Sequence, residues 1–543
     1  MKPIHRLRQL FTGAVFFLIL PSGCEAPDQP AETHMAYKMK LSGDWRIDGD
    51  LPTQALLISL QGVANEDGPQ LYLVYPEDWP YNYTPHLLEY LDKERNFTFK
   101  EIQSPVEALA KLKWNAKGYV VWDRSERTSL IVAFTAAGLE DAVVVSEEQI
   151  PLAEGAGLKM IEDFRGKFTG MSDLEIYQWA YDRYWHRCDQ GFLTYMGGVG
   201  GDQMMPGIAD YGMYRNSFFT DLSADPEDTL EFAMTNRILS EMNPLSLVLG
   251  WHSYVKDTEA QHISLLSSYQ IRQEGLNTYP NMSFMTHVPL EEGFVFRNNH
   301  NVDPDSVLVP EPKVYITCIQ TDGLGIGAYH KPGRGQVPYA WEVTMIWLET
   351  APVMLEYFYK ISTPNDYFIG SLGGPTYMYP KPTPREALPK MISIADSLRR
   401  RLDLRVFEIM DYSEGNRYMG NIDLPKEVVD AYYEGMPDVL GFINGYGPAY
   451  TFDMRDGRPF LSYDYYLSPD RPDADAIGDL KELATLNDLR PYYLVMHVRE
   501  SSDIQRVKGI LDGLGPEFEV VPLDVLLRMA AHTPTSATRY LTQ

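Results

Sequence analysis

The 543-residue sequence has little cysteine and little positive charge, and each shortage excludes a class of protein. Its three cysteines are too few for a disulfide framework or a zinc-type cysteine cluster. The 47 Lys and Arg residues face 75 Asp and Glu residues, which gives a formal net charge of −28. Such a charge repels phosphates and anionic lipid headgroups, so we expect no nucleic-acid partner.

Several catalytic motifs are also missing. The sequence contains no H-E-x-x-H, C-x-x-C or G-x-S-x-G pattern, which argues against a metalloprotease, a dithiol redox protein and a serine hydrolase. The glycine-rich run at 323–335 does not have the spacing of a phosphate-binding loop, so nucleotide binding is not expected. We therefore predict no metal and no cofactor.

The N-terminus is typical of an exported protein. Three basic residues within the first eight precede an apolar run of ten residues (11–20), which is too short to span a bilayer. The following Leu-Pro-Ser-Gly-Cys resembles a bacterial lipobox, although the leucine lies one place further from Cys24 than usual. We predict a signal peptide (1–23), a lipidated Cys24 with a polar linker (24–38), and a lipid-anchored protein of the bacterial cell envelope on its periplasmic or surface face. The alternative is cleavage nearby and a free soluble protein.

In the rest of the chain, short apolar segments typical of strands alternate with amphipathic segments typical of helices. Continuous apolar strands between helices predict parallel sheets that are covered on both faces. The predicted strands are 70–76, 118–123, 141–146, 245–251, 313–322, 366–374, 405–413, 439–447, 492–499 and 518–524. The clearest predicted helices are 104–114, 384–402 and 502–514.

A polar, proline-containing link at 297–313 predicts a domain boundary. We expect an N-terminal α/β region of one or two domains (39–300). Beyond it, the regular alternation predicts a (β/α)-barrel-like domain (301–535), distorted or incomplete.

Ligands of such folds bind beyond the carboxyl ends of the strands, so the strand ends give a list of candidate site residues. In the second half this rule selects Asp322 and Asp411 as catalytic carboxylates, with Glu414 near Asp411. It also selects His497 and Arg499 for binding an anion or sugar hydroxyls. In the first half it selects Trp251 and His252 for binding and Glu259 as a further acid. Trp341, Tyr377 and Tyr379 are candidate sugar-stacking aromatics.

Each candidate also has a structural interpretation. An aspartate before a glycine can cap a turn, as at Asp322, and Asp411 and Glu414 can cap a helix. His497 and Arg499 alternate on one strand and can form a buried ion pair. Aromatic side chains such as Trp341 and Tyr377 can be core residues.

Several segments together resemble the GxGYxYSP family of bacterial envelope proteins, which are described as glycoside hydrolases. "GPTYMYP" (374–380) is similar to the signature that names the family. The other similar segments follow in the family's order, and they are "SLQGVANEDGPQLYL" (59–73), "VLGWHSYVKDTE" (248–259), "YPNMSF" (279–284), "APVMLEYFYKISTPNDYFI" (351–369) and the C-terminal stretch 497–530.

The resemblance implies a carbohydrate role in the envelope and adds Asn281 as a candidate substrate-binding residue. The chain departs from the family pattern at two places. Thr376 stands where the signature has glycine, and the serine before Pro380 is missing. The family's S-D-G-D-N segment reads Thr-Asp-Gly-Leu-Gly at 321–325, so Asp322 matches but the second acid does not.

Three functions follow from these observations. The first is a glycoside hydrolase that acts on an extracellular or periplasmic glycan, with Asp322 and Asp411 facing each other as acid and base or nucleophile. The second is a glycan-binding surface lipoprotein without catalysis, because the second family acid is replaced. The third is a polysaccharide deacetylase or lyase that uses His497. A carbohydrate is the expected partner in all three, and the sequence leaves the oligomeric state open.

Overall fold

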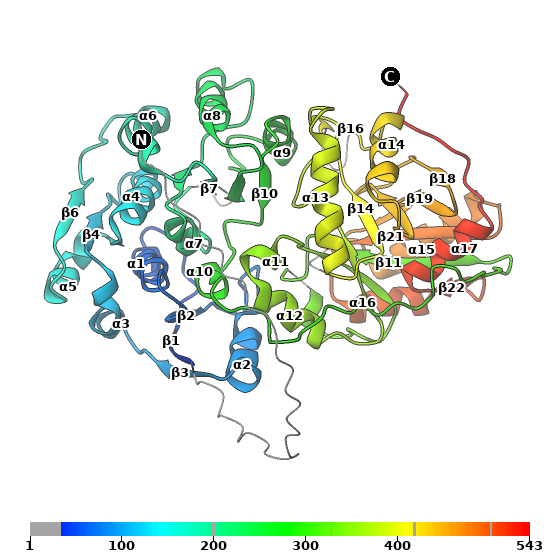
Figure 1. Ribbon diagram of the computed structural model, residues 1–543, viewed down its shortest axis with the longest axis horizontal. Helices are drawn as coiled ribbons and strands as arrows, with labels where there is room; N and C mark the ends of the chain where they lie inside the picture. The colour runs from blue at the N-terminus through cyan, green and yellow to red at the C-terminus, as the bar shows by residue number, and fades with distance from the viewer. Residues whose placement is uncertain (1–33, 198–200, 327, 416–419, 500–501, 543) are drawn as a thin grey trace, which may run out of the picture.

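The computed structural model describes residues 34–197, 201–326, 328–415, 420–499 and 502–542. The predicted signal peptide, Cys24 and most of the linker lie outside these residues. Figure 1 shows an N-terminal α/β region beside a C-terminal α/β region. Among the described residues, no helix is long and apolar enough to cross a membrane.

The N-terminal region contains three separate parallel sheets with helices between their strands. The sheets have the orders β2-β1-β3, β5-β4-β6 and β10-β9-β7-β8. Their strands are β1 His34–Lys40, β2 Leu71–Val74, β3 Phe97–Glu101, β4 Gly118–Val121, β5 Ala142–Val145, β6 Met160–Asp163, β7 Phe192–Met196, β8 Phe218–Thr220, β9 Leu247–Trp251 and β10 Arg272–Glu274. The helices of this region are α1 Leu51–Ala64, α2 Thr84–Glu94, α3 Pro105–Leu112, α4 Arg127–Glu140, α5 Ile150–Gly155, α6 Asp173–Tyr184, α7 Ala209–Tyr214, α8 Thr229–Glu241, α9 Glu259–Ser268 and α10 Met282–Met285.

The C-terminal region contains one ten-stranded sheet, which is parallel except for the edge strand β18. Its order is β18-β19-β17-β14-β13-β12-β11-β21-β20, and β22 also pairs with β11. The strands are β11 Val314–Gln320, β12 Tyr339–Val343, β13 Asp366–Gly370, β14 Val406–Ile409, β17 Gly441–Asn444, β18 Asp453–Arg455, β19 Arg458–Ser462, β20 Tyr465–Leu467, β21 Tyr492–Val498 and β22 Phe518–Val520. A small hairpin, β15 Glu414–Gly415 and β16 Gly420–Asn421, lies outside the sheet.

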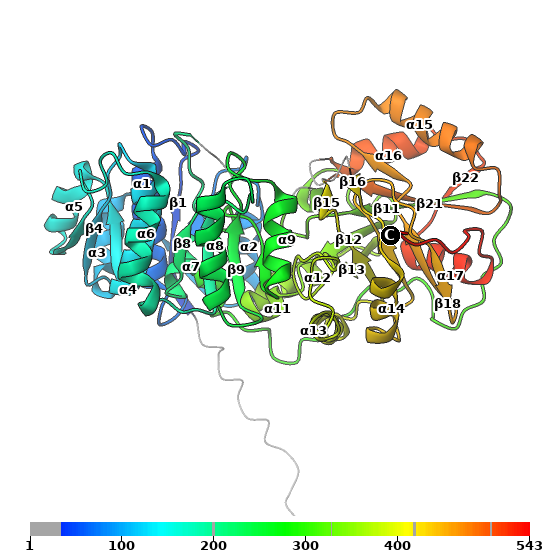
Figure 2. The ribbon, with the colours of Figure 1, turned by 90° about the horizontal axis from the view of Figure 1, so that it is seen from above.

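Helices pack on both faces of this sheet. They are α11 Trp347–Thr350, α12 Pro352–Lys360, α13 Leu388–Arg401, α14 Lys426–Gly435, α15 Asp473–Leu486, α16 Ile504–Asp512 and α17 Leu523–His532. Figure 2 shows α15 and α16 on one side of the sheet and α13 and α14 on the other.

All ten predicted strands and the three predicted helices occur, with ends that differ by a few residues. The mixed α/β class with parallel sheets is confirmed. The barrel is not confirmed, because the hydrogen-bonded strand order is open between β19 and β20. The prediction missed several short or partly polar strands, including β10 and β12. Both carry a glutamate at or near their carboxyl ends.

The two faces of the C-terminal strands belong to two different cores. Alternate residues of a strand point to opposite faces. One set, for example Ile316 and Phe407, joins the large helix-covered core. The other set, for example Ile319 and Val406, packs with Leu526 of α17 in a second cluster. Cys318 lies in the first core and is buried.

Asn281 lies within the N-terminal region and pairs with the backbone of β2. Its Nδ2 donates to Leu73 O and its Oδ1 accepts from Leu73 N, each at 2.8 Å. Gln61 Nε2 also donates to Asn281 Oδ1. Asn281 is fully buried in a left-handed conformation (φ 61°), which asparagine tolerates better than most residues. These contacts replace the substrate-binding prediction for Asn281 with a structural role.

We expect Asn281→Ala to lower the free energy of unfolding by roughly 2–4 kcal/mol, because it leaves both backbone groups of Leu73 buried without partners. Asn96→Ala is a matched control, since Asn96 is also left-handed (φ 55°) but exposed. It should lose only about 1 kcal/mol. Urea unfolding of the two variants measures the difference, and equal losses would show that the Leu73 contacts contribute nothing.

Candidate functional site

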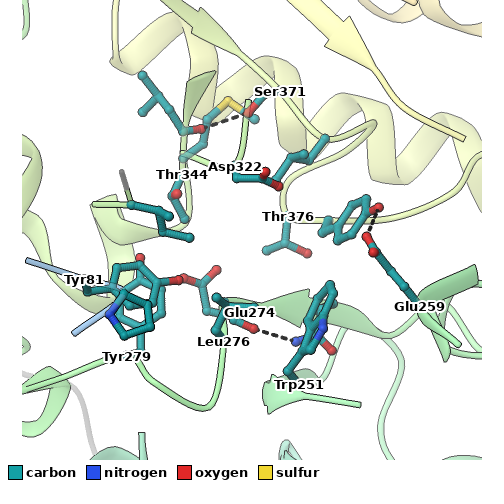
Figure 3. Close-up of a pocket in the computed structure, with 18 of the residues that line it drawn as sticks. Tyr81, Trp251, Glu259, Glu274, Leu276, Tyr279, Asp322, Thr344, Ser371 and Thr376 are labelled. Carbon is teal, nitrogen blue, oxygen red and sulfur yellow. Dashed lines mark hydrogen bonds between the residues drawn. The ribbon is translucent and has the colours of Figure 1, made fainter. Parts of the chain in front are cut away.

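A pocket of about 430 Å³ lies where the N-terminal and C-terminal regions meet. Figure 3 shows 18 of its lining residues. The lining residues are Pro80, Tyr81, Trp251, Tyr254, Glu259, Gln273, Glu274, Gly275, Leu276, Tyr279, Asp322, Ile326, Val343, Thr344, Met345, Ser371, Leu372, Pro375, Thr376, Tyr377, Tyr446 and Arg499.

Strand ends of both regions form the walls of this pocket. Trp251 ends β9 and Glu274 ends β10 of the N-terminal region. Asp322 and Ser371 follow β11 and β13 of the C-terminal sheet, and Arg499 follows β21. Carboxyl ends of parallel strands are where ligands bind in α/β folds. The sequence predicted candidates in both halves of the chain, and strand ends of two sheets build the pocket.

Glu274 contributes a buried carboxyl group to the pocket. Its Oε1 accepts from Trp347 Nε1 at 2.9 Å. Burial raises the pKa of Glu274 to about 8, although the Trp347 hydrogen bond and the nearby Arg272 act against this rise. Glu274 is therefore mainly protonated at neutral pH and can donate a proton.

Glu259 and Asp322 are the other carboxyl groups that line the pocket. Glu259, the first residue of α9, accepts from Tyr377 Oη at 2.7 Å. Asp322 has a left-handed backbone (φ 71°) and is followed by Gly323 (φ 81°), so the chain turns sharply as it leaves β11. Asp322 and Glu274 come from different regions of the chain and line different walls in Figure 3.

Two further carboxyl groups, Glu342 on β12 and Glu408 on β14, are fully buried next to Asp322. Glu342 Oε2 accepts from Asp322 N at 2.8 Å. Burial, together with the neighbouring Glu408 and Asp322, raises the pKa of Glu342 well above its usual range. Burial also raises the pKa of Glu408 to about 8. This pair was not predicted from the sequence, although a glutamate inside an apolar strand is rare enough to be a signal.

Aromatic rings line the remaining walls. The rings of Trp251 and Tyr377 are parallel within 9°, with centroids 6.1 Å apart. Tyr254 is mostly exposed and also lines the pocket. The backbone conformation before Tyr377 requires a glycine at position 373. Gly373 has a φ of 76°, and a Cβ at this position would lie 2.5 Å from Met378 O. The segment 371–380 therefore forms a tight turn that presents Tyr377 to the pocket.

Five of the predicted site residues line the pocket, and seven others lie elsewhere. The five are Asp322, Glu259, Trp251, Tyr377 and Arg499. The seven are Asp411, Glu414, His252, Asn281, Trp341, Tyr379 and His497.

Asp411 and Glu414 belong to a structural cluster around Lys381. The Asp411 carboxylate accepts from Lys381 N at 2.7 Å and from Ser413 Oγ at 2.6 Å, and it is fully buried. Lys381 Nζ lies 3.6 Å from Asp411 and 3.7 Å from the exposed Glu414. The predicted Asp322–Asp411 pair is therefore corrected, because Asp411 holds a loop and does not face the pocket.

Trp341 and Tyr379 are core residues. Trp341 Nε1 donates to Asp366 Oδ1 at 2.8 Å, and the ring is 1% exposed. Tyr379 is fully buried and hydrogen-bonded to Tyr377 Oη at 3.1 Å. The structure therefore favours the core interpretation for both rings.

The two predicted histidines are also buried outside the pocket. His252 Nδ1 is 2.8 Å from Asp257 Oδ1. His497 contacts Thr321 Oγ1 and Tyr446 O through its two ring nitrogens. His497 therefore orients residues that adjoin the pocket. Within the described part of the chain, no group of three or more His, Cys, Asp or Glu side chains is arranged to hold a metal ion.

Comparison with known proteins gives one family along most of the chain. The model described as "GxGYxYP putative glycoside hydrolase C-terminal domain" matches residues 312–531. Models for the first, second and third N-terminal domains of the same family match residues 38–113, 116–188 and 192–287. The family name GxGYxYP has no serine before the proline. Within residues 374–380, the chain therefore differs from this signature at Thr376, which stands in place of the second glycine.

A solved structure has a similar fold. It is titled a "putative hydrolase" from Bacteroides thetaiotaomicron VPI-5482, with 18% sequence identity and a TM-score of 0.76. The similarity covers 93% of this chain and 96% of that chain. No curated protein matches.

We expect Asp411→Asn to lower the free energy of unfolding by roughly 1–3 kcal/mol, because it removes a buried carboxylate that accepts several hydrogen bonds. Asp322→Asn is the control, and it should change stability little. Thermal unfolding of both variants checks this assignment. An unchanged melting temperature for Asp411→Asn would contradict the structural role of Asp411.

Proposed function

This chain belongs to the GxGYxYP family, and from the chemistry of its pocket we propose that it is a glycoside hydrolase. Its substrate would be an extracellular or periplasmic glycan. Glycosidic cleavage needs one protonated acid near the leaving oxygen and one carboxylate as base or nucleophile. The pocket supplies carboxyl groups in two different environments, which is the single observation that carries the proposal.

Glu274 is the proposed general acid. Its burial keeps it protonated at neutral pH, and it lies at the carboxyl end of β10 in the pocket wall. Asp322 is the proposed base or nucleophile, since it enters the pocket from the C-terminal region. Glu259 binds the Tyr377 hydroxyl and is placed to accept a hydrogen bond from a sugar hydroxyl. This assignment replaces the Asp322–Asp411 pair.

The aromatic walls suit a sugar ring. CH groups of a pyranose pack against aromatic faces, and Trp251, Tyr377 and the exposed Tyr254 present such surfaces in or beside the pocket. Arg499 is the one positively charged side chain that lines the pocket among the described residues, and its guanidinium donates to Tyr446 Oη.

A barrel-like scaffold is also part of this proposal. β19 and β20 are separated by two residues, Tyr463 and Asp464. Tyr463 N donates to Asn444 O of β17 at 3.1 Å, and Asp464 N donates to Val495 O of β21 at 2.9 Å. These contacts support one kinked strand, 458–467, that joins both ends of the parallel sheet around α17.

We further propose that the protein is exported and anchored through a lipid on Cys24. The basic start and the apolar run at 11–20 support this location. Mass spectrometry of the detergent-extracted protein should find diacylglyceryl on Cys24 and no residues before it. An unmodified N-terminus at Met1 would contradict export.

Reducing-end release from a panel of plant and algal glycans, with and without chelator, tests the hydrolase proposal. We expect Glu274→Gln and Asp322→Asn each to lower turnover by roughly 10²–10⁴. Wild-type turnover should fall as the pH rises above about 8, because Glu274 then loses its proton. Aryl glycosides with a strongly acidic leaving group need no proton donor, so they should restore much of the Glu274→Gln rate but not the Asp322→Asn rate.

Glu356→Gln and Asp411→Asn are matched controls, because both carboxyl groups are fully buried outside the pocket. Both control variants should keep their turnover at temperatures where they remain folded. Full activity of Glu274→Gln and Asp322→Asn would exclude this pair. Glycan binding without release by the wild-type protein would instead favour a binding lipoprotein, and loss of activity with chelator would favour metal-dependent deacetylation.

A further inference from the structure

Glu342 and Glu408 each hold one wall of the pocket. Glu342 Oε2 accepts from Asp322 N at 2.8 Å, and Glu408 Oε2 accepts from Leu372 N at 3.3 Å. Asp322 and Leu372 directly line the pocket, whereas the two glutamates lie behind them. Two carboxyl groups from β12 and β14 therefore fix the loops that follow β11 and β13.

Both of these loops begin with an unfavourable backbone conformation. Asp322 has φ 71° and Leu372 has φ 65°, and a glycine in the left-handed region follows each of them. A leucine in this region is uncommon, because its Cβ crowds the backbone, so the conformation costs free energy. The contact from the buried carboxyl group to the backbone N–H of each residue offsets this cost and selects the conformation.

The two carboxyl groups also contact each other. They lie within hydrogen-bonding reach, across the intervening strand β13. Glu342 Oε1 and Glu408 Oε1 are buried, and among the described residues neither has a protein donor. Two adjacent carboxylates away from water repel each other strongly, whereas one shared proton gives both Oε1 atoms a partner.

Within the described part of the chain, one further acid and two phenol groups face the pair. Asp322 approaches from the loop after β11, Tyr463 from the segment between β19 and β20, and Tyr432 from α14. Burial raises the pKa values of both tyrosines, so they stay neutral. On β21, His497 contacts Thr321 Oγ1 and Tyr446 O.

We propose that Glu342 and Glu408 share one proton and act as a positioning pair that sets the Asp322 and Leu372 walls for the reaction at the pocket. This proposal rests on the proposed hydrolase function for its catalytic consequence. When both groups ionise at alkaline pH, their repulsion pushes the two walls apart. Neither group touches the substrate, so neither needs to be a carboxylate for the chemistry.

Glutamine and alanine variants separate positioning from chemistry. Glu342→Gln and Glu408→Gln each keep an oxygen for the backbone N–H and supply N–H donors that replace the shared proton. Each should retain turnover within about threefold at pH 6–7. Glu342→Ala and Glu408→Ala remove the backbone acceptor and should lower kcat by tenfold or more, with a smaller change in KM. Loss of activity in the glutamine variants equal to that in the alanine variants would overturn the positioning role.

A stability measurement tests the shared proton without any substrate. A carboxyl group with a raised pKa in the folded state stabilises the fold at low pH and loses this contribution as the pH rises through the folded pKa. The wild-type melting temperature should therefore fall between pH 7 and 9.5. Each single glutamine variant should show a smaller fall, because the second ionisation is removed.

Glu356→Gln controls for replacing a buried glutamate, since Glu356 is fully buried and paired with Arg95 at 2.7 Å. It should keep the wild-type pH dependence. A wild-type pH dependence in both Glu342→Gln and Glu408→Gln would overturn the shared proton. If the wild-type protein releases no sugar, the hydrolase proposal fails, and the melting curves still decide whether the pair shares a proton.

Discussion

The desolvation of carboxyl groups is the constraint on which this site depends. A carboxylate that is removed from water without a cationic partner is costly, so the group keeps its proton. Glu274 has Trp347 as its hydrogen-bond donor and is buried, and its pKa rises to about 8. The same physics acts on Glu342 and Glu408 behind the pocket wall. A chain with a net charge of −28 thus contains carboxyl groups that retain protons where the two regions meet.

The fold brings these acids together through the direction of its strands. All strands of the β10-β9-β7-β8 sheet are parallel, and so are β11, β12 and β13. The carboxyl ends of each set therefore lie at one edge, where side chains and loop backbones are free to meet a ligand. The pocket forms where these two edges meet, so neither region alone contains both Glu274 and Asp322. Their relative position, and with it the proposed chemistry, depends on the contact between the regions.

Much of this arrangement was predictable from the sequence. Uninterrupted apolar segments predicted the ten strands. The expectation that ligands bind beyond the carboxyl ends of strands then selected Asp322, Trp251 and Arg499. Glu274 was missed because β10 is three residues long and reads Arg-Gln-Glu, which has no strand-like periodicity. Glu342 was missed because its strand, β12, was not predicted, and Glu408 was missed because it lies within β14 and not at the strand end. Asp411 fits the same rule as Asp322, and only long-range contacts with Lys381 show its structural role.

The central claim is that Glu274 is protonated at neutral pH while it lines the pocket opposite the Asp322 wall. Infrared difference spectra between pH 7 and pH 9.5 measure this protonation directly, through the carbonyl band of un-ionised carboxyl groups. We predict that the wild-type protein loses such a band as the pH rises, and that Glu274→Gln lacks part of this loss. Identical difference spectra would show that Glu274 does not titrate between pH 7 and pH 9.5. If the un-ionised carboxyl band at pH 7 is also the same in the wild-type protein and Glu274→Gln, then Glu274 is already ionised at pH 7, which would contradict its role as the general acid.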